Sequence, residues 1–590
     1  MNFLGIERNI MESEKTYRKR LISYVGRHKR YALPGLAVMT VISLGRVVQP
    51  LILREIVDKA VPRGDTSLLL RYALAYLAVI VISGGLTYAG NMLTARLGLS
   101  IVTRIKEDLF AHLLRLPVSY FDAHPVGELM SRTENDTEKV RDVFSSLGVT
   151  FIVSVLMMAG MFAVTFVLAP VLALVMLGVV AVFLVVLLYF FNKLLSLYEA
   201  SRGLYAKILA KVTEFVQGME IVRVFDRKAW AMESLDLTGR AKRRNDVKVS
   251  LFEFSAMSAI DALVGPLFIV GLILLYAPRV LSGGMSLGTL LLFFEYGASL
   301  LRPVAEIAEC IRRMQQARIS FGRITSIMSL PEEEGLENEE EAAFGKEIRF
   351  EHVWFAYKDE DWVLKDLSFS IPKGSLTAVV GSSGSGKSTT VGLLCGFYRP
   401  LKGSITIDGR PLESLDLRSW REKIGLVLQD VYLFPGSVLE NVRVYNDDVA
   451  EESVAKALES VRASGMIRTL PSGLQTNLWE RGGNLSAGEK QLLAFARALA
   501  ADPELVILDE ATSNIDMDTE EKIRLSLDIL LEGRTALIVA HRLSSVLHAD
   551  QILFFREGRI VARGSHSELL ASLPEYRRLV EQQFLDREAV

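Results

Sequence analysis

Residues 376–395 read LTAVVGSSGSGKSTTVGLLC, and this stretch decides the fold of the C-terminal half of the chain. Leu376–Val380 is an apolar run typical of a buried strand, and helical periodicity begins at Lys387. Between them, Gly381–Ser388 matches the P-loop pattern, in which glycines let backbone N–H groups curl around phosphates at a helix N-terminus. The flanking strand and helix are those that this pattern requires. We therefore predict an α/β domain of the P-loop NTPase type.

Each residue type in this loop has a chemical role. The Lys387 ammonium reaches the β- and γ-phosphates of a nucleotide, and the Ser388 hydroxyl ligates Mg²⁺. The other loop residues that we assign to the nucleotide are Ser382, Ser383, Gly384, Ser385, Gly386 and Thr389. The expected cofactors are therefore ATP and Mg²⁺.

Two further apolar strands end in polar residues that suit the same reaction. Leu505–Leu508 runs into Asp509, placed to hold Mg²⁺ through water, and Glu510, placed to polarise the attacking water. Such a pair is more often a helix N-cap, but the P-loop earlier in the chain favours catalysis. The strand Ala536–Ala540 ends at His541, and the carboxyl edge of a parallel sheet faces the ligand crevice. The alternative for His541 is a surface residue without a role.

Residues 347–590 resemble the nucleotide-binding domain of ATP-binding-cassette (ABC) transporters. Asn484–Glu489 reads NLSAGE and is similar to the family signature Leu-Ser-Gly-Gly-Gln, with departures at Ala487 and Glu489. The resemblance implies further roles: Tyr357 stacks on adenine, Gln429 senses Mg²⁺ and the γ-phosphate, Ser513–Asp516 is the D-loop with Asp516 as its carboxylate, His541 is the switch histidine, and Thr476–Gly482 is the X-loop of exporters.

The resemblance also implies a working cycle that needs two chains. Two nucleotide-binding domains sandwich ATP, so that one chain's P-loop and the other chain's signature, here Ser486 and Gly488, hold each nucleotide. ATP binding closes the sandwich and turns the membrane helices from inward- to outward-facing, and hydrolysis resets them. Because this chain carries one domain of each kind, a second half-transporter chain is expected as its partner.

The N-terminal half is dominated by apolar segments. A membrane helix needs about 20 apolar residues. Six segments qualify, at 32–53, 68–90, 147–169, 171–191, 256–277 and 287–308. Buried soluble helices are the alternative, but 171–191 contains no charged residue at all. The predicted fold class is an α-helical membrane domain of six long helices followed by an ABC-type α/β domain.

Basic residues set the expected orientation of this membrane domain. They cluster in 15–30, before the first segment, and in 240–248, before the fifth. The positive-inside rule therefore places both termini and both long connections in the cytoplasm. Residues 14–30 are expected to form an amphipathic elbow on the inner membrane surface.

The two long connections keep a helical periodicity and should extend the membrane helices into the cytoplasm. We predict that they reverse near Phe121–Val140 and Gly218–Ala231, where Gly127 and Gly218 interrupt the pattern. Tyr120–Asp122 and Gly127–Arg132 resemble the first intracellular loop of type IV exporters.

The predicted domains are a transmembrane domain at 1–328, an acidic linker at 329–346 and the ABC domain at 347–590. The acidic run from Pro331 to Glu341 is interpreted as a solvated linker. The net charge of −2 does not suggest nucleic-acid binding. The only cysteines, Cys310 and Cys395, exclude a disulfide framework. We expect a multi-pass protein of a bacterial inner membrane with its ABC domain in the cytoplasm.

The predicted function is ATP-driven export of a hydrophobic or amphipathic drug, lipid or peptide. The two signature departures favour a heterodimer, and a homodimeric lipid flippase, an ATP-gated channel and a regulatory sensor are the alternatives. Charged residues at membrane depth are costly and often functional. Arg46, Asp261 and Glu295 therefore either line a cargo cavity or form structural pairs between helices.

Overall fold

The computed structural model describes residues 23–336, 338–358, 360–509, 517–540 and 546–588. The chain divides into two compact units. The first comprises Met1–Leu114 with Val126–Leu330, and the second comprises Arg115–Pro125 with Pro331–Val590. The eleven-residue segment Arg115–Pro125 thus packs with the C-terminal unit, although the sequence on both of its sides belongs to the first.

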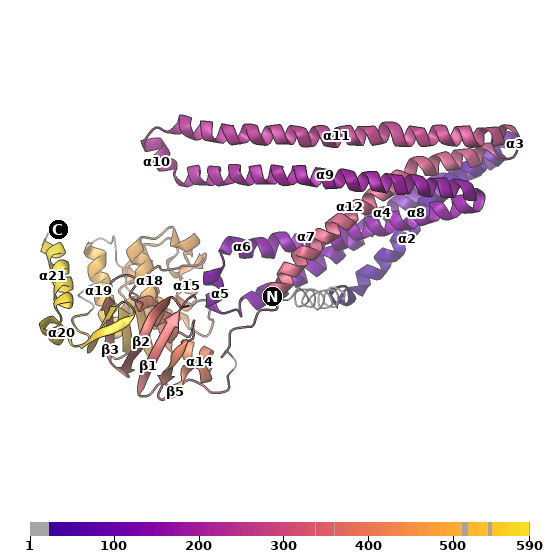
Figure 1. Cartoon of the computed structure of the whole chain (residues 1–590). Helices are drawn as coiled ribbons and strands as arrows, with labels where there is room; N and C mark the ends of the chain where they lie inside the picture. The colour runs from indigo at the N-terminus through magenta and orange to yellow at the C-terminus, as the bar shows by residue number, and fades with distance from the viewer. Residues whose placement is uncertain (1–22, 337, 359, 510–516, 541–545, 589–590) are drawn as a thin grey trace. The chain divides into compact units, whose positions relative to one another are not determined.

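The first unit is entirely helical in its described part. Its elements are α2 (Lys29–Glu55), η1 (Ile56–Ala60), α3 (Val61–Arg63), α4 (Thr66–Leu113), α6 (Val126–Ser131), η2 (Arg132–Asp136), α7 (Thr137–Asp142), η3 (Val143–Leu147), α8 (Gly148–Leu168), α9 (Pro170–Gln217), α10 (Met219–Val224), α11 (Lys228–Leu281) and α12 (Leu287–Ile327). The six predicted apolar segments correspond to α2, α4, α8, α9, α11 and α12. The helices α9 and α11 run beside each other, with α10 at the turn between them (Figure 1).

The apolar character of these helices suits a bilayer. Among the described residues, three helical stretches are long and apolar enough to cross a membrane by length and composition: Lys29–Arg63, Thr66–Leu113 and Val126–Leu168. Shorter apolar stretches occupy Pro170–Val186 and Pro266–Leu281. Inside the bundle, the Tyr296 hydroxyl on α12 donates a 2.8 Å hydrogen bond to the carbonyl of Val47 on α2.

The second reversal lies where the sequence predicts it, and the first overlaps the predicted range Phe121–Val140 only at its start. The helix α9 ends at Gln217 with Gly218 at its C-cap, and α11 begins at Lys228. In the first connection, α4 already ends at Leu113 and the chain turns through α5 (Val118–Ala123). Gly127 lies inside α6 and does not interrupt it. The prolines Pro117 and Pro125 bound α5, because a residue before proline avoids helical geometry and proline donates no backbone hydrogen bond.

The second unit contains two main sheets. A four-stranded sheet has the order β2 (Trp362–Pro372), β1 (Glu347–Ala356), β4 (Lys402–Ile407) and β5 (Arg410–Pro411). A six-stranded sheet has the order β12 (Arg559–Gly564), β11 (Gln551–Arg556), β3 (Leu376–Gly381), β10 (Thr535–Val539), β9 (Leu505–Asp509) and β6 (Ile424–Val427). Its strands are parallel from β11 to β6, and β12 is antiparallel to β11. The short strands β7 (Gly436–Ser437) and β8 (Asn477–Leu478) pair with each other.

Helices surround these sheets (Figure 1). They are α13 (Lys387–Leu394), η4 (Leu412–Ser414), α14 (Leu417–Glu422), α15 (Val438–Arg443), α16 (Glu451–Ser460), α17 (Ser464–Thr469), η5 (Gly473–Gln475), η6 (Glu480–Gly482), α18 (Ala487–Ala500), α19 (Met517–Leu531), α20 (His566–Ser572) and α21 (Pro574–Glu588). Every residue of β9 and β10 is buried, as expected for central strands covered on both faces.

The acidic run that opens the second unit is exposed over most of its described length, as the sequence predicts, but not at Glu333. The Glu333 side chain is only 12% exposed and forms an ion pair with Arg421. Glu334 pairs with Arg399. An acidic residue in such a run can be docked where the folded domain supplies a cation, and the order of residues along the run does not reveal that cation.

Candidate functional site

The P-loop joins the end of β3 to the start of α13. Gly384 and Gly386 have φ of +77° and +99°, where residues with a side chain are strained. Gly381 has no room for a side chain, because a Cβ there would lie 2.3 Å from the Phe555 carbonyl oxygen. These glycines let the backbone turn tightly around the position that the sequence assigns to phosphate.

The Lys387 side chain is held inside this loop. It is 6% exposed, and its Nζ donates hydrogen bonds of 2.9 Å to the carbonyl oxygens of Gly381 and Ser382. Burial lowers the pKa of Lys387 below its ordinary value, and the Asp509 carboxylate partly offsets this. The ammonium therefore lies at the loop from which it would bind phosphate oxygens.

Ser388 and Asp509 form the part of the site that suits Mg²⁺. The Ser388 hydroxyl donates a 3.0 Å hydrogen bond to Asp509 Oδ2. Asp509 Oδ1 and the Ser385 hydroxyl are buried and lack a hydrogen-bond partner among the described residues. Buried polar atoms without partners are costly, and hard oxygen donors are the ligands that Mg²⁺ prefers. These residues fit a hydrated Mg²⁺ and a phosphate oxygen.

The parallel sheet brings the carboxyl ends of β3, β10, β9 and β6 to the same edge. In the parallel register, Val539 of β10 lies opposite Asp509 of β9 and Val379 of β3. Gln429 follows β6, the neighbour of β9, and is exposed. The predicted catalytic residues Glu510 and His541, and Asp516 of the D-loop, lie outside the described residues.

The Tyr357 ring offers an open face for a base. This side chain is 52% exposed, and its hydroxyl lies 3.0 Å from the Thr389 hydroxyl on α13. Phe355 and Tyr398 meet the ring edge-on, with centroids 5.0 and 5.2 Å away. These perpendicular contacts fix the plane of the ring, and its exposed part is available to a base.

The signature residues begin helix α18. Ser486 is the N-cap, and Glu489 completes a capping box: the Glu489 N–H donates to the Ser486 hydroxyl at 3.3 Å, and the Ser486 N–H donates to Glu489 Oε2 at 2.8 Å. Ser486 and Ala487 are exposed, whereas Gly488 is buried. The carboxylate of Glu489 thus lies at the helix N-terminus, where backbone N–H groups would otherwise favour an external anion.

Comparisons with known proteins agree with this geometry. Residues 35–304 match the pattern of the ABC transporter transmembrane region, and residues 364–513 match that of the ABC transporter. The chain belongs to the ABC transporter family. It is 35% identical to a probable multidrug resistance ABC transporter ATP-binding/permease protein of Bacillus subtilis, over 86% of this chain and 76% of the relative.

Two further proteins extend this similarity. A multidrug resistance ABC transporter ATP-binding and permease protein of Lactococcus lactis is 33% identical over 82% of both chains. The solved structure of a bacterial Atm1-family ABC exporter with ATP bound covers 94% of this chain and 98% of its own, with a TM-score of 0.78 and 26% identity. This ABC transporter therefore has the exporter fold, and it couples ATP hydrolysis to transport as a multi-pass membrane protein that works as a dimer.

The candidate cargo residues of this ABC transporter are not brought together by the described contacts. Arg46 and Glu295 are exposed, and neither forms an ion pair or hydrogen bond with a described residue. The side chain of Asp261 on α11 lies outside the described residues. Sequence reasoning missed Glu306, which accepts hydrogen bonds from the Ser154 hydroxyl at 2.6 Å and from Arg302 Nε at 3.0 Å.

A spacing argument could have found Glu306. It follows Glu295 by eleven residues on α12, which is three helical turns, so both carboxylates lie on nearly the same face about 16 Å apart. Sequence reasoning also missed Arg421, which forms an ion pair with Glu333. No local sequence pattern marks Arg421, because its partner is distant in the chain.

Proposed function

We propose that this ABC transporter is the catalytic half of a heterodimeric exporter of cationic, hydrophobic or amphipathic compounds. Its P-loop and Glu510 would form the hydrolytic composite site with the intact signature of a partner chain. Its own signature would complete a second site that mainly holds ATP. ATP and Mg²⁺ would bind at the P-loop, with Ser388, Gln429 and Asp509 around the metal.

The observation that carries the heterodimer is the contact between Glu489 and Ser486. In the family, a neutral glutamine stands where Glu489 stands here. The glutamate carboxylate places a negative charge beside the serine that should face the partner's γ-phosphate. Two unit charges 4 Å apart interact by about 4 kcal/mol at the effective dielectric constant of a protein surface. This repulsion, together with the added methyl of Ala487, would weaken hydrolysis at one composite site only.

The exposed tip of the second intracellular connection supports the need for a partner. Ile221, Val224 and Phe225, in and just after α10, are 66%, 79% and 69% exposed. Large apolar side chains gathered at the tip of a long cytoplasmic connection mark a protein interaction site. A nucleotide-binding domain that moves the membrane helices would bind such a tip.

The proposed cargo class rests on the charges of α12. Glu295 is exposed at membrane depth, and Glu306 lies three turns along nearly the same face. Acidic residues inside a membrane domain attract cations, and the apolar surroundings favour a hydrophobic body. The Bacillus subtilis and Lactococcus lactis relatives are named as multidrug resistance transporters, which is consistent with this class. The proposed location is a bacterial inner membrane, with the ABC domain in the cytoplasm.

The test is to purify this chain expressed alone and together with a half-transporter encoded by an adjoining gene. The proposal predicts little ATPase activity and no transport for the single chain, and both activities for the pair. A stable homodimer with full ATPase activity and transport would favour the homodimeric flippase instead. Unitary conductance in a planar bilayer would favour the ATP-gated channel, because a pump shows none.

A further inference from the structure

Residues 331–346, here called the strap, connect the last membrane helix to the ABC domain. The strap starts four residues after α12 ends at Ile327. Its central contact is the bidentate ion pair of Glu333 with Arg421 on α14, with N–O distances of 2.7 and 3.0 Å. The two side chains are only 12% and 27% exposed. Paired, charge-assisted hydrogen bonds of this kind fix both distance and orientation.

Arg421 also binds the end of the P-loop helix. Its Nε donates to the Cys395 carbonyl and its Nη2 to the Gly396 carbonyl, both at 3.1 Å. These carbonyls lie at the C-terminal end of α13, where a cation is favoured by the helix dipole. The first turn of the same helix carries Lys387 and Ser388. One guanidinium therefore joins the strap to the helix that holds the phosphates.

The backbone of Glu333 makes a third connection. Its N–H donates a 2.7 Å hydrogen bond to the carbonyl of Arg115, and the neighbouring Glu332 carboxylate lies 3.4 Å from the Arg115 guanidinium. Arg115 follows the end of α4 by two residues and leads into α5. The chain leaving α12 and the chain leaving α4 therefore meet at Glu333.

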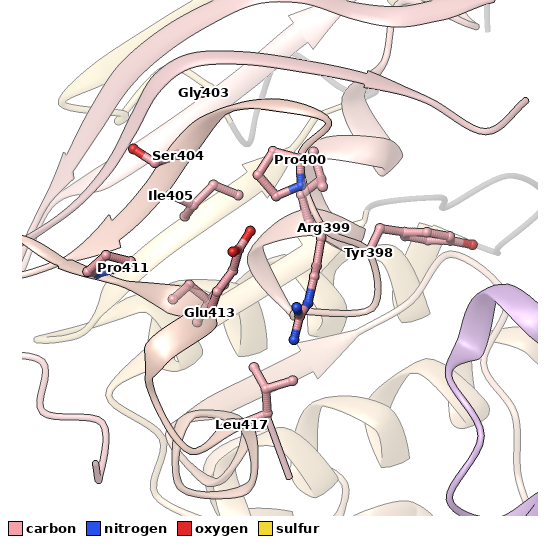
Figure 2. A pocket seen from close by; sticks show the side chains of 12 residues that line it. Tyr398, Arg399, Pro400, Gly403, Ser404, Ile405, Pro411, Glu413 and Leu417 are labelled. Carbon is pink, nitrogen blue, oxygen red and sulfur yellow. The ribbon is translucent and has the colours of Figure 1, made fainter. Parts of the chain in front are cut away.

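Two glycines allow the strap to lie this close to the domain. Gly335 in the strap has φ of +93°, and Gly396 after α13 has φ of +68°. A Cβ on Gly335 or Gly396 would lie 3.2 or 2.8 Å from side-chain atoms of Leu417. The Leu417 N–H also donates to the Gly335 carbonyl at 2.8 Å. Leu417 lines the same pocket as Arg399, the residue that pairs with Glu334 of the strap (Figure 2).

We propose that Glu333 is a positioning residue that couples the P-loop helix to two membrane helices at once. A displacement of α13 on ATP binding is carried by Arg421 to Glu333, and from there along the backbone to α12 and, through Arg115, to α4. The residue acts through its contacts with Arg421 and Arg115. This inference rests on the ATP-driven transport cycle, and it adds a route through the strap to the tips of the intracellular connections.

The test uses the purified dimeric transporter in lipid nanodiscs. Spin labels at Arg63 and Gly283 report the distance between the outer ends of α3 and α11 as ATP is added, and ATPase activity is measured without cargo. For Glu333→Gln we expect hydrolysis close to the wild-type rate, but a change in label distance that needs at least ~10-fold more ATP. The matched control Glu332→Gln, which alters the Arg115 contact on the exposed side and leaves the Arg421 pair in place, should behave as the wild type in both measurements.

A second variant separates coupling from folding. Arg421→Lys keeps the charge but cannot bind the carboxylate and both carbonyls together, so it should shift the ATP dependence in the same direction. The double variant Glu333→Gln with Arg421→Lys should need no more ATP for the change in label distance than the more severe single variant. Both substitutions act through the same ion pair, so their effects should not add. Additive shifts of the ATP dependence in the double variant would overturn the inference. Equal behaviour of Glu333→Gln and Glu332→Gln would overturn it too, and so would a loss of ATP hydrolysis in Glu333→Gln together with the loss of the distance change. If the distance between the labels in the wild-type transporter does not change when ATP is added, the ATP-driven transport cycle itself is contradicted.

Discussion

Ser388 at the start of α13 and Asp509 at the end of β9 are joined by a 3.0 Å hydrogen bond across 121 residues of sequence. This contact brings together the two segments that the sequence assigns to Mg²⁺ and to hydrolysis. Asp509 Oδ1 remains without a partner among the described residues. The residue that follows Asp509 in the sequence is Glu510, which we propose as the catalytic carboxylate.

The first prediction concerns catalysis. In the purified complex, Glu510→Gln should slow hydrolysis at this chain's site by about 10²–10⁴, the usual contribution of a positioned general base. ATP affinity, measured by equilibrium binding, should stay near that of the wild type. Lys387→Ala should instead weaken ATP binding, since it removes the ammonium held in the loop by Gly381 and Ser382. Wild-type turnover in the Glu510 variant would show that another group activates the water.

The second prediction concerns orientation. Cysteines introduced at Arg63 and Gly283, at the ends of α3 and α11, should react with a membrane-impermeant reagent added outside intact cells. Cysteines at Gly127 and Gly218 should react only after the membrane is opened. The native Cys310 and Cys395 are buried and provide a low background. The opposite labelling pattern would reverse the topology inferred from the basic residues.

The third prediction concerns cargo. Glu295→Gln should change which cationic compounds stimulate ATPase activity in a panel of amphiphiles, because it removes an exposed charge at membrane depth. An unchanged ranking of compounds in the Glu295 variant would remove this residue from the cargo site. Loss of the folded protein would favour its structural role.

The fourth prediction is a pH dependence of stability. Hydrogen bonds from Lys373 and Lys423, both 2.8 Å long, hold the pKa of Glu504 below its ordinary value. A carboxylate with a depressed pKa stabilises the fold above its unfolded value of about 4.3, and this contribution is lost as the pH falls through the folded value. Thermal unfolding of Glu504→Gln should therefore occur at lower temperature than that of the wild type near pH 7.

The two unfolding curves in this experiment should converge as the pH falls below about 4. A difference between wild type and Glu504→Gln that is the same at every pH would assign the effect to packing instead of charge.

Short sequence patterns predict those elements of this protein whose structure depends on neighbouring residues alone. The P-loop, the apolar central strands and the long apolar helices each follow from a short stretch of residues. The docking of Glu333 was mispredicted, because its partner Arg421 lies 88 residues away and an acidic run looks the same whether solvated or paired. The first reversal was misplaced because Gly127 was weighted above Pro117 and Pro125, although helices tolerate glycine better than proline. Glu306 was overlooked because the spacing of eleven residues between Glu295 and Glu306, which puts both carboxylates on nearly the same face of α12, was not considered.

The central claim is that this chain is the hydrolytic half of an asymmetric dimer, and vanadate trapping tests it most directly. The purified two-chain complex is incubated with a photoreactive ATP analogue, Mg²⁺ and vanadate, which traps the product only where hydrolysis has occurred. The claim predicts trapped diphosphate on the P-loop of this chain and retained triphosphate on the partner. In a complex carrying Glu489→Gln, trapping should begin to appear on the partner as well. Equal trapping on both chains of the wild-type complex, or full trapping in a homodimer of this chain, would contradict it.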